Sequence, residues 1–205
     1  MFDFVMDGYA TLAAFFIFAA PAVWNTLAHL EYGSKKISSL FRGNMEHGFR
    51  LVMVIIICMQ LIRNAFFYLS CINSTSMFPA IDDFLRSIPT LVNLVAYPIH
   101  IFGWVLSITS FYRLGFKGTY EGDCFGFLFD KMITAFPFGF VPHPMYFGGA
   151  LLFVSSALHY YSSTGLILAI WSIFVYIIFS YLVEQPYTEL IYANRDKAKE
   201  TKKEE

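Results

Sequence analysis

Charged side chains are scarce in this sequence. Only 14% of its 205 residues are Asp, Glu, Lys or Arg, whereas 57% are hydrophobic, against about 45–50% in an ordinary soluble domain. So apolar a composition indicates a protein that lies in a lipid bilayer. The formal net charge is −1 and the chain has no basic stripe, which argues against a nucleic-acid partner.

Cysteine is scarce as well. Cys58, Cys71 and Cys124 show neither paired nor metal-like spacing. Disulfide frameworks and zinc sites both need cysteines at short, regular intervals. The sequence therefore implies neither a disulfide framework nor a metal site.

Four long stretches lack charged residues altogether, namely 8–30, 51–62, 87–112 and 144–183. A membrane-spanning helix needs about 20 predominantly apolar residues, so the first and third stretches qualify as they stand. The second qualifies, as 49–71, if Arg63 faces the protein interior or a headgroup. The fourth is long enough for two passes, with turn residues in its middle.

These stretches predict an all-α fold, a polytopic helical bundle integral to the membrane. We expect four to five membrane segments, the last two forming a hairpin of about 146–161 and 164–183. Residues 1–193 are expected to form one membrane-embedded domain, and residues 194–205 a charged C-terminal tail.

Basic residues are shared unevenly among the segments outside these stretches. Segments 31–50 and 113–143 and the C-terminal tail carry most of them, whereas 72–87 carries only Arg86. Because short basic loops remain in the cytosol, we expect these two loops and the C-terminus on the cytosolic side. The final KKEE resembles the dilysine retrieval signal of endoplasmic reticulum membrane proteins, which a cytosolic receptor reads; a merely solubilising tail is the alternative.

Three groups of polar residues stand out, because ionisable groups at membrane depth are rare and often functional. The first lies in the glycine- and aromatic-rich loop 113–144, a composition also typical of an ordinary interfacial loop. The second is His143, which would cap a helix starting at Pro144 and exposing free N–H groups to an anion. The third is Glu184 with Glu189, where a carboxylate can hold a cation or merely end a membrane helix.

The strings in these regions resemble the class II phospholipid N-methyltransferases, the phosphatidylethanolamine N-methyltransferase family. They read LGFKGTYEGDCFGFLFDKMITAFPF, HPMYFGG and EQPYTELIYANRDKAK, and the resemblance covers nearly the whole chain. It implies a multi-pass enzyme of phosphatidylcholine synthesis, with S-adenosylmethionine as methyl donor and a membrane phospholipid as substrate. It also implies a location in the endoplasmic reticulum membrane, with a mitochondrial membrane as the alternative.

The resemblance further implies residues that bind the donor. The family uses a Gly-x-Gly element, which aligns with Ile101, Phe102 and Gly103, and a Glu-Glu pair, which aligns with Glu184 and Gln185. Ile101 and Gln185 depart from these patterns. The swap at Gln185 removes a charge, keeps an acceptor and adds donors.

A second element is shared with the related isoprenylcysteine carboxyl methyltransferases. Their His-Pro-x-Tyr-x-Gly pattern is reproduced in HPMYFGG, which implies donor contacts for His143 and Tyr146. The phospholipid enzymes usually have Asn where His143 stands.

Methyl transfer needs an uncharged amine in line with the sulfonium methyl group, so positioning supplies several kcal/mol of the acceleration. On this interpretation Glu184 pairs with the cationic donor, and Glu189 or His143 accepts the proton of the amine.

For the lipid substrate, Tyr120 and Tyr187 can present aromatic rings to the methylated ammonium group. Arg113 can meet the lipid phosphate. Each tyrosine can equally be an interface anchor, and Arg113 can equally serve only to set topology.

Two alternatives stay open at this point. Another membrane methyltransferase of the isoprenylcysteine carboxyl methyltransferase superfamily would keep the His143 and Glu184 elements but should lack the strings GTYEGD and AFPF. A non-catalytic membrane scaffold with a degenerate donor site would account for Ile101 and Gln185, and it predicts no binding of S-adenosylmethionine.

Overall fold

The protein is helical throughout. The computed structural model describes residues 7–131 and 133–204, and this part of the chain contains no strand. Four helical runs are long and apolar enough to cross a membrane. They are α1 (Gly8–Ser34), α3 (Met45–Asn73), α5 (Pro89–Thr119) with its continuation, and the run of α7 (Ser163–Ile177), η2 (Ile178–Glu184) and α8 (Gln185–Glu204). With the shorter α6 (Pro144–His159), this confirms the predicted all-α membrane bundle of four to five segments.

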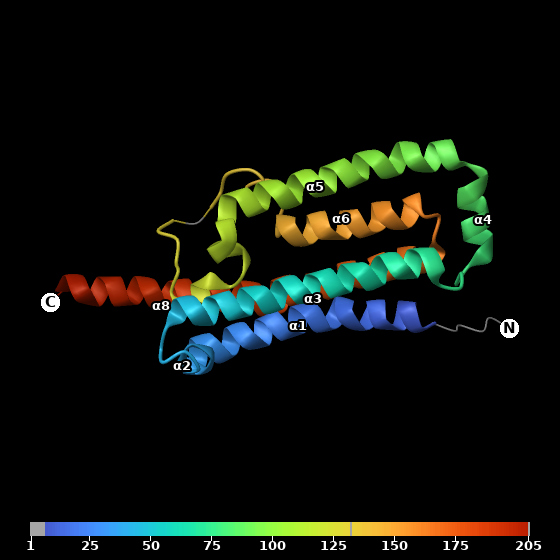
Figure 1. Ribbon diagram of the computed structural model, residues 1–205. Coiled ribbons are helices and arrows are strands. Elements are labelled where there is room, and N and C mark those ends of the chain that lie inside the picture. Colours follow the sequence, from blue (N-terminus) through green and yellow to red (C-terminus); the bar gives the residue numbers. More distant parts are fainter. Residues whose placement is uncertain (1–6, 132, 205) are drawn as a thin grey trace.

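The helices form an elongated bundle (Figure 1). α1 runs antiparallel to α3, and α6 lies along α5. α6 and α7 pack on each other through a short turn at 160–162, which is the predicted hairpin. α8 runs across residue 193 without a break. The division there between a membrane-embedded domain and a C-terminal tail stays a prediction.

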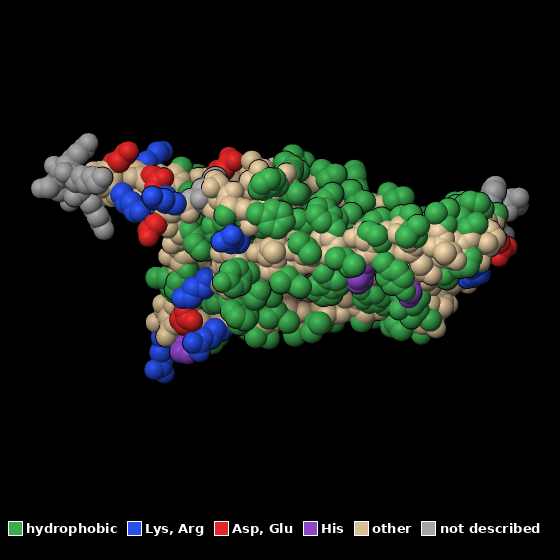
Figure 2. Space-filling view, turned by 90° about the horizontal axis from the view of Figure 1, so that it is seen from above, with side chains coloured by type: hydrophobic (Ala, Val, Ile, Leu, Met, Phe, Trp, Pro, Cys, Tyr) green, Lys and Arg blue, Asp and Glu red, His purple; other side chains and the backbone are tan. Residues whose placement is uncertain are grey.

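The connecting segments divide between the two ends of the bundle. The short α2 (Lys36–Ser39), the 3-10 turn η1 (Gly122–Phe125) and α8 lie at one end, whereas α4 (Pro79–Ser87) lies across the other (Figure 1). Most of the Lys and Arg side chains in Figure 2 gather at the α8 end, and the flank between the ends is largely apolar. We call these the basic end and the α4 end. Which of them faces the cytosol stays a prediction.

Helix starts follow capping residues in the sequence. The Asp7 carboxylate accepts the N–H of Ala10 at 3.0 Å, and the Ser162 hydroxyl accepts that of Gly165 at 3.0 Å. These contacts satisfy N–H groups that have no partner within the helix. Pro144 stands at the first turn of α6, where its missing N–H is not needed.

α5 extends beyond the predicted end of its membrane segment at Tyr112. Its last turn is set off by Gly115, whose φ of +60° and ψ of −171° are not helical. This is a conformation that a residue without Cβ adopts readily. The chain therefore turns at Gly115 and carries η1 inward, against α1 and α3.

Candidate functional site

Glu184 and Tyr146 meet at the basic end of the bundle. The Tyr146 hydroxyl, near the start of α6, donates a hydrogen bond to Oε2 of Glu184 at 2.5 Å. Glu184 closes the π-helical stretch η2, and such stretches frequently mark functional sites. The Tyr146 ring lies 6.4 Å from that of Trp24 and 5.2 Å from that of Tyr176. A carboxylate among aromatic rings is an environment that suits a cation.

Three side chains beside this pair form a hydrogen-bonded row. Gln185 donates from Nε2 to Oε1 of Glu189 at 3.0 Å, and its Oε1 lies 3.3 Å from Nε2 of His143. Because a carboxylate only accepts, Glu189 fixes the orientation of the amide. The amide oxygen also only accepts, so Nε2 of His143 must donate. Nδ1 is then the imidazole atom that can take up a proton.

The environment of His143 favours its uncharged form. Burial lowers the pKa of the imidazole below its ordinary 6.5, and the hydrogen bond to Gln185 opposes this only in part. His143 also adopts the left-handed conformation, with φ of 45°. Strained backbone of this kind clusters at functional sites. The ring is thus held in place and uncharged near neutral pH.

Two further carboxylates, which the sequence does not single out, lie close to Glu184. Glu121 and Asp123 interact electrostatically with Glu184. Their carboxylate oxygens and Sγ of Cys124 lie within 4.8 Å of one another. The only sign of them in the sequence is the pair of acidic residues in GTYEGD. The sequence alone does not show whether these acids are buried or lie in a solvated loop. Together these groups make the electrostatic potential around Glu184 more negative. The expectation that no metal binds here stays a prediction.

A cavity of about 420 Å³ opens at the basic end, next to these acids. This volume falls within the range of about 300–1,000 Å³ typical of small-molecule sites. α1, η1 and α8 all contribute to its wall, with Tyr32, Lys35, Asp123, Asn194 and Arg195 supplying polar groups. Nζ of Lys35 also donates to the carbonyl of Cys124 at 3.3 Å, which links α1 to η1.

The three residues of the predicted Ile101–Gly103 element lie in different environments. Ile101 is 63% and Phe102 46% exposed on the outer flank of α5, whereas Gly103 is buried against α6. A Cβ on Gly103 would lie 3.0 Å from the carbonyl oxygen of Gly148, and one on Gly148 would lie 2.9 Å from that of Gly103. The two glycines allow α5 and α6 to approach closely, as small residues do in membrane bundles. Donor binding by this element stays a prediction.

The predicted lipid-binding residues lie in different places. The Tyr187 ring stacks at 3.6 Å on that of His29 and lies 5.6 Å from that of Tyr32, beside the cavity. Tyr120 packs instead on the rings of Phe111 and Phe116, which lie before and after the bend in α5. Arg113 donates to the carbonyl of Phe136 at 3.3 Å. Their roles toward a lipid stay predictions.

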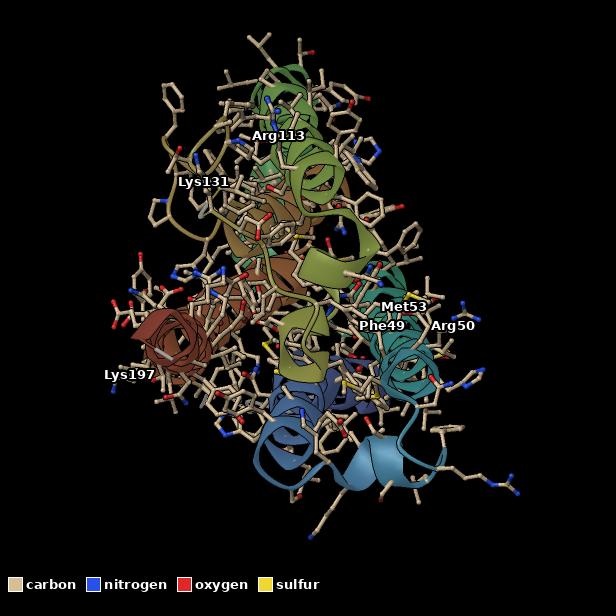
Figure 3. All side chains as sticks on the ribbon, turned by 90° about the vertical axis from the view of Figure 1, so that its left-hand side faces the viewer. Phe49, Arg50, Met53, Arg113, Lys131 and Lys197 are labelled. Carbon is tan, nitrogen blue, oxygen red and sulfur yellow. The ribbon has the colours of Figure 1, made fainter. Side chains whose placement is uncertain are left out.

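Positive charge surrounds the basic end. In Figure 3, Arg50, Arg113, Lys131 and Lys197 lie toward the periphery, whereas Phe49 and Met53 of α3 lie nearer the centre. Phe49 is 3% exposed and packs against η1 through the ring of Phe125 at 6.0 Å. Phe49 thus packs beside the turn that carries the acids, whereas the four labelled cations lie further out.

Comparison with known proteins agrees with the resemblance noted from the sequence. The family model described as phospholipid methyltransferase matches residues 91–195. A phosphatidyl-N-methylethanolamine N-methyltransferase of Neurospora crassa is 37% identical over 96% of this chain and 89% of its own length. One of Schizosaccharomyces pombe is 36% identical over 90% of each chain. A phosphatidylethanolamine N-methyltransferase of Homo sapiens is 30% identical over 85% of this chain and 83% of its own.

No solved structure matches the chain significantly. The matched residues 91–195 include α5, η1, α6 and the run from α7 into α8, and so hold Tyr146, Glu184 and the row from His143 to Glu189. The chain is thus a multi-pass membrane protein that belongs to the phospholipid methyltransferase family.

Proposed function

We propose that the protein transfers methyl groups from S-adenosylmethionine to the headgroup nitrogen of phosphatidylethanolamine and its mono- and dimethyl derivatives, giving phosphatidylcholine. The names of the relatives support this substrate class. The observation that carries the proposal is the Tyr146–Glu184 pair, a hydrogen-bonded carboxylate among aromatic rings at the end of membrane-spanning helices. It offers a cation-binding group where lipid headgroups meet water.

The residues at the basic end fit such a donor. S-Adenosylmethionine supplies an electrophilic methyl group on a positively charged sulfur. Glu184 and Asp123 supply the opposite charge, and Lys35 and Arg195 in the wall of the cavity can pair with a carboxylate. The hydroxyl of Tyr146 keeps the Glu184 carboxylate oriented. The attraction between opposite charges is stronger in this partly enclosed site than it would be in water.

The row of His143, Gln185 and Glu189 supplies the proton acceptor. An ammonium headgroup must lose a proton before its nitrogen can attack, and Nδ1 of His143 is the atom available to take it. Gln185 holds the ring from the Nε2 side, and Glu189 holds Gln185. The mono- and dimethyl products must each lose a proton again before the next transfer, whereas the trimethyl product has none to lose.

The lipid approaches from the bilayer and the donor from water. Arg113 and Lys131 at the periphery of the basic end offer positive charge to the lipid phosphate (Figure 3). The Tyr187 ring beside the cavity can face the methylated ammonium group.

The location we propose is the endoplasmic reticulum membrane, with the basic end and the C-terminus in the cytosol; a mitochondrial membrane is the alternative. The support is the excess of Lys and Arg at the basic end. The KKEE signal at 202–205 lies outside the residues whose side chains the structure describes.

The test is a methyl-transfer assay with purified protein in nanodiscs. Labelled S-adenosylmethionine is supplied with phosphatidylethanolamine, its monomethyl form or its dimethyl form. We expect label in phosphatidylcholine, and a loss of about tenfold or more in Glu184→Gln, which keeps the shape but removes the charge. Glu200→Gln on the exposed part of α8 is the matched control. If folded protein labels none of the three lipids, the proposal is wrong.

A further inference from the structure

A second hollow lies on the flank of the bundle toward the α4 end. α6 lies between α3 and α5 and ends at His159 (Figure 1). A cavity of about 440 Å³ opens beside its last turns, and its polar lining comes from Tyr68, Tyr97, His100, Ser155, Ser156, His159 and Tyr160. Figure 2 shows histidine side chains among apolar ones on the flank toward the α4 end. Ser155 is about 14 Å further along α6 than Tyr146, at a rise of about 1.5 Å per residue, so this hollow is separate from the proposed active site.

One wall of the hollow is a completed chain of hydrogen bonds. Nε1 of Trp104 donates to Nε2 of His100 at 3.0 Å, so the ring proton of His100 is on Nδ1. That nitrogen donates to Oγ of Ser155 at 2.9 Å, and Ser155 donates to the carbonyl of Leu152 at 3.1 Å. Each of these polar groups has a partner, so the wall is fixed.

Nearer the α4 end, the same two helices carry hydrogen-bonding groups that the protein does not use. Oδ1 of Asn93 lies 3.3 Å from Nδ1 of His159, which must donate because the amide oxygen only accepts. Within residues 7–131 and 133–204, Nε2 of His159 and the hydroxyls of Tyr97 and Tyr160 have no hydrogen-bond partner. All three side chains are exposed, so these groups are free to bind a molecule that enters the hollow.

We infer that this hollow binds the phosphodiester headgroup of a glycerophospholipid from the leaflet at the α4 end. The hollow opens on the lipid-facing flank, where Tyr97 is 56% and its neighbour Leu94 68% exposed, so bilayer lipids are the molecules that reach it. Its described lining contains hydroxyl and imidazole groups but no Asp or Glu, which suits phosphate oxygens. The Tyr97 and His159 rings, 5.8 Å apart, offer aromatic surface to the ammonium group of the same headgroup.

The bound lipid also acts on the fold. A headgroup in the hollow bridges α5 and the end of α6, so it stabilises the helix whose other end carries His143 and Tyr146. A ligand that binds only the folded state raises the apparent stability in proportion to its concentration. Phospholipid added to delipidated protein in detergent therefore raises the unfolding temperature.

The experiment uses photoactivatable phosphatidylcholine in nanodiscs that contain the full chain. One probe carries the diazirine on the headgroup and the other carries it at the end of an acyl chain. The headgroup probe should label residues 153–160 more strongly than the acyl probe. Tyr97→Leu combined with His159→Leu should lower this labelling about fivefold or more, since each removes a potential hydrogen bond to a charged group.

Tyr112→Leu is the matched control, because Tyr112 is an 83% exposed phenol on the same helix but outside the hollow. It should leave the labelling unchanged. Methyl transfer by the double variant should stay within about twofold of the wild type, so a failure of the proposed enzymatic function would not count against this site. Equal labelling by both probes, or no loss in the double variant, would show only an interfacial aromatic belt. Displacement of the probe by a sterol but not by excess phospholipid would also overturn the inference.

Discussion

The hydroxyl of Tyr146 donates a hydrogen bond to the carboxylate of Glu184 across 2.5 Å, joining residues 38 positions apart in the chain. Tyr146 stands in the first turns of α6 and Glu184 at the end of η2. The bond therefore closes the hairpin of α6 and α7 at its open end. It also holds a carboxylate facing the acids of η1, which places negative charge where membrane-spanning helices reach the headgroups.

Removal of the phenol hydroxyl tests this relationship directly. We expect Tyr146→Phe to weaken binding of S-adenosylmethionine about 10- to 100-fold, because a hydrogen bond to a charged group contributes about 1.5–3 kcal/mol. Titration calorimetry of the purified protein measures it. Tyr112→Phe, at a position that is 83% exposed, is the control. Equal affinities in the wild type and Tyr146→Phe would exclude the pair from the donor site.

The pH dependence of the activity should report His143. Burial holds the pKa of His143 below 6.5, so wild-type kcat/KM should fall only at a pH below that value, as the base becomes protonated. Gln185→Glu places a negative charge against the ring, which favours the imidazolium and raises the pKa of His143. The acidic limb should therefore move to higher pH. An unmoved limb would show that His143 is not the base.

The same shift links His143 to stability. The pKa of His143 is lower in the folded state than in the unfolded state, so the folded state binds this proton less readily. The contribution of His143 to the free energy of unfolding is therefore complete above pH 6.5 and is lost as the pH falls through the lowered pKa. Thermal unfolding of the wild type and of His143→Asn, which does not titrate, should therefore converge as the pH falls from 7 to 5. Parallel curves would contradict the lowered pKa.

The contact between α5 and α6 can be tested with two adjacent glycines. A Cβ on Gly148 would lie 2.6 Å from Oγ of Ser107 and 2.9 Å from the carbonyl oxygen of Gly103, whereas one on Gly149 would approach only the Tyr176 ring, at 3.8 Å. Gly148→Ala should therefore lower the stability by about 1–3 kcal/mol through overpacking, and Gly149→Ala should be close to neutral. Thermal unfolding in detergent measures both. Similar losses in the two variants would show that the contact is not specific.

Topology can be measured with single cysteines. Cys124 is only 1% exposed, so it cannot report on sidedness. In a chain without native cysteines, Ser39→Cys at the end of α2 should react with an impermeant reagent from the cytosol. Asp83→Cys in α4 should react only from the opposite side, because the two positions are exposed at opposite ends of the bundle. The reverse pattern would invert the orientation.

Much of the fold could be predicted from where charges are missing. The stretch predicted as 49–71 is the core of α3, and the last stretch divides at the predicted turn into α6 and α7. The end of α5 was missed, because the turn at Gly115 depends on a backbone conformation that glycine permits but does not impose.

The candidate site was less predictable. The sequence marks His143 and Glu184 because ionisable residues stand out beside long apolar segments. It does not show that Gln185 links His143 to Glu189, since that depends on side-chain geometry around the start of α8. Nor does it show that Glu121 and Asp123 turn inward, because the sequence of a glycine-rich loop is the same whether its acidic side chains are buried or solvated.

The sequence by itself determined that this chain crosses a membrane and where its helices lie, because transfer of apolar side chains into lipid depends on local composition alone. Only the tertiary structure decided which polar groups meet. Tyr146 contacts Glu184, and Gly103 contacts Gly148, because helices that are distant in the chain pack closely together. Such contacts follow from the shapes of whole helix faces, which no short stretch of sequence specifies.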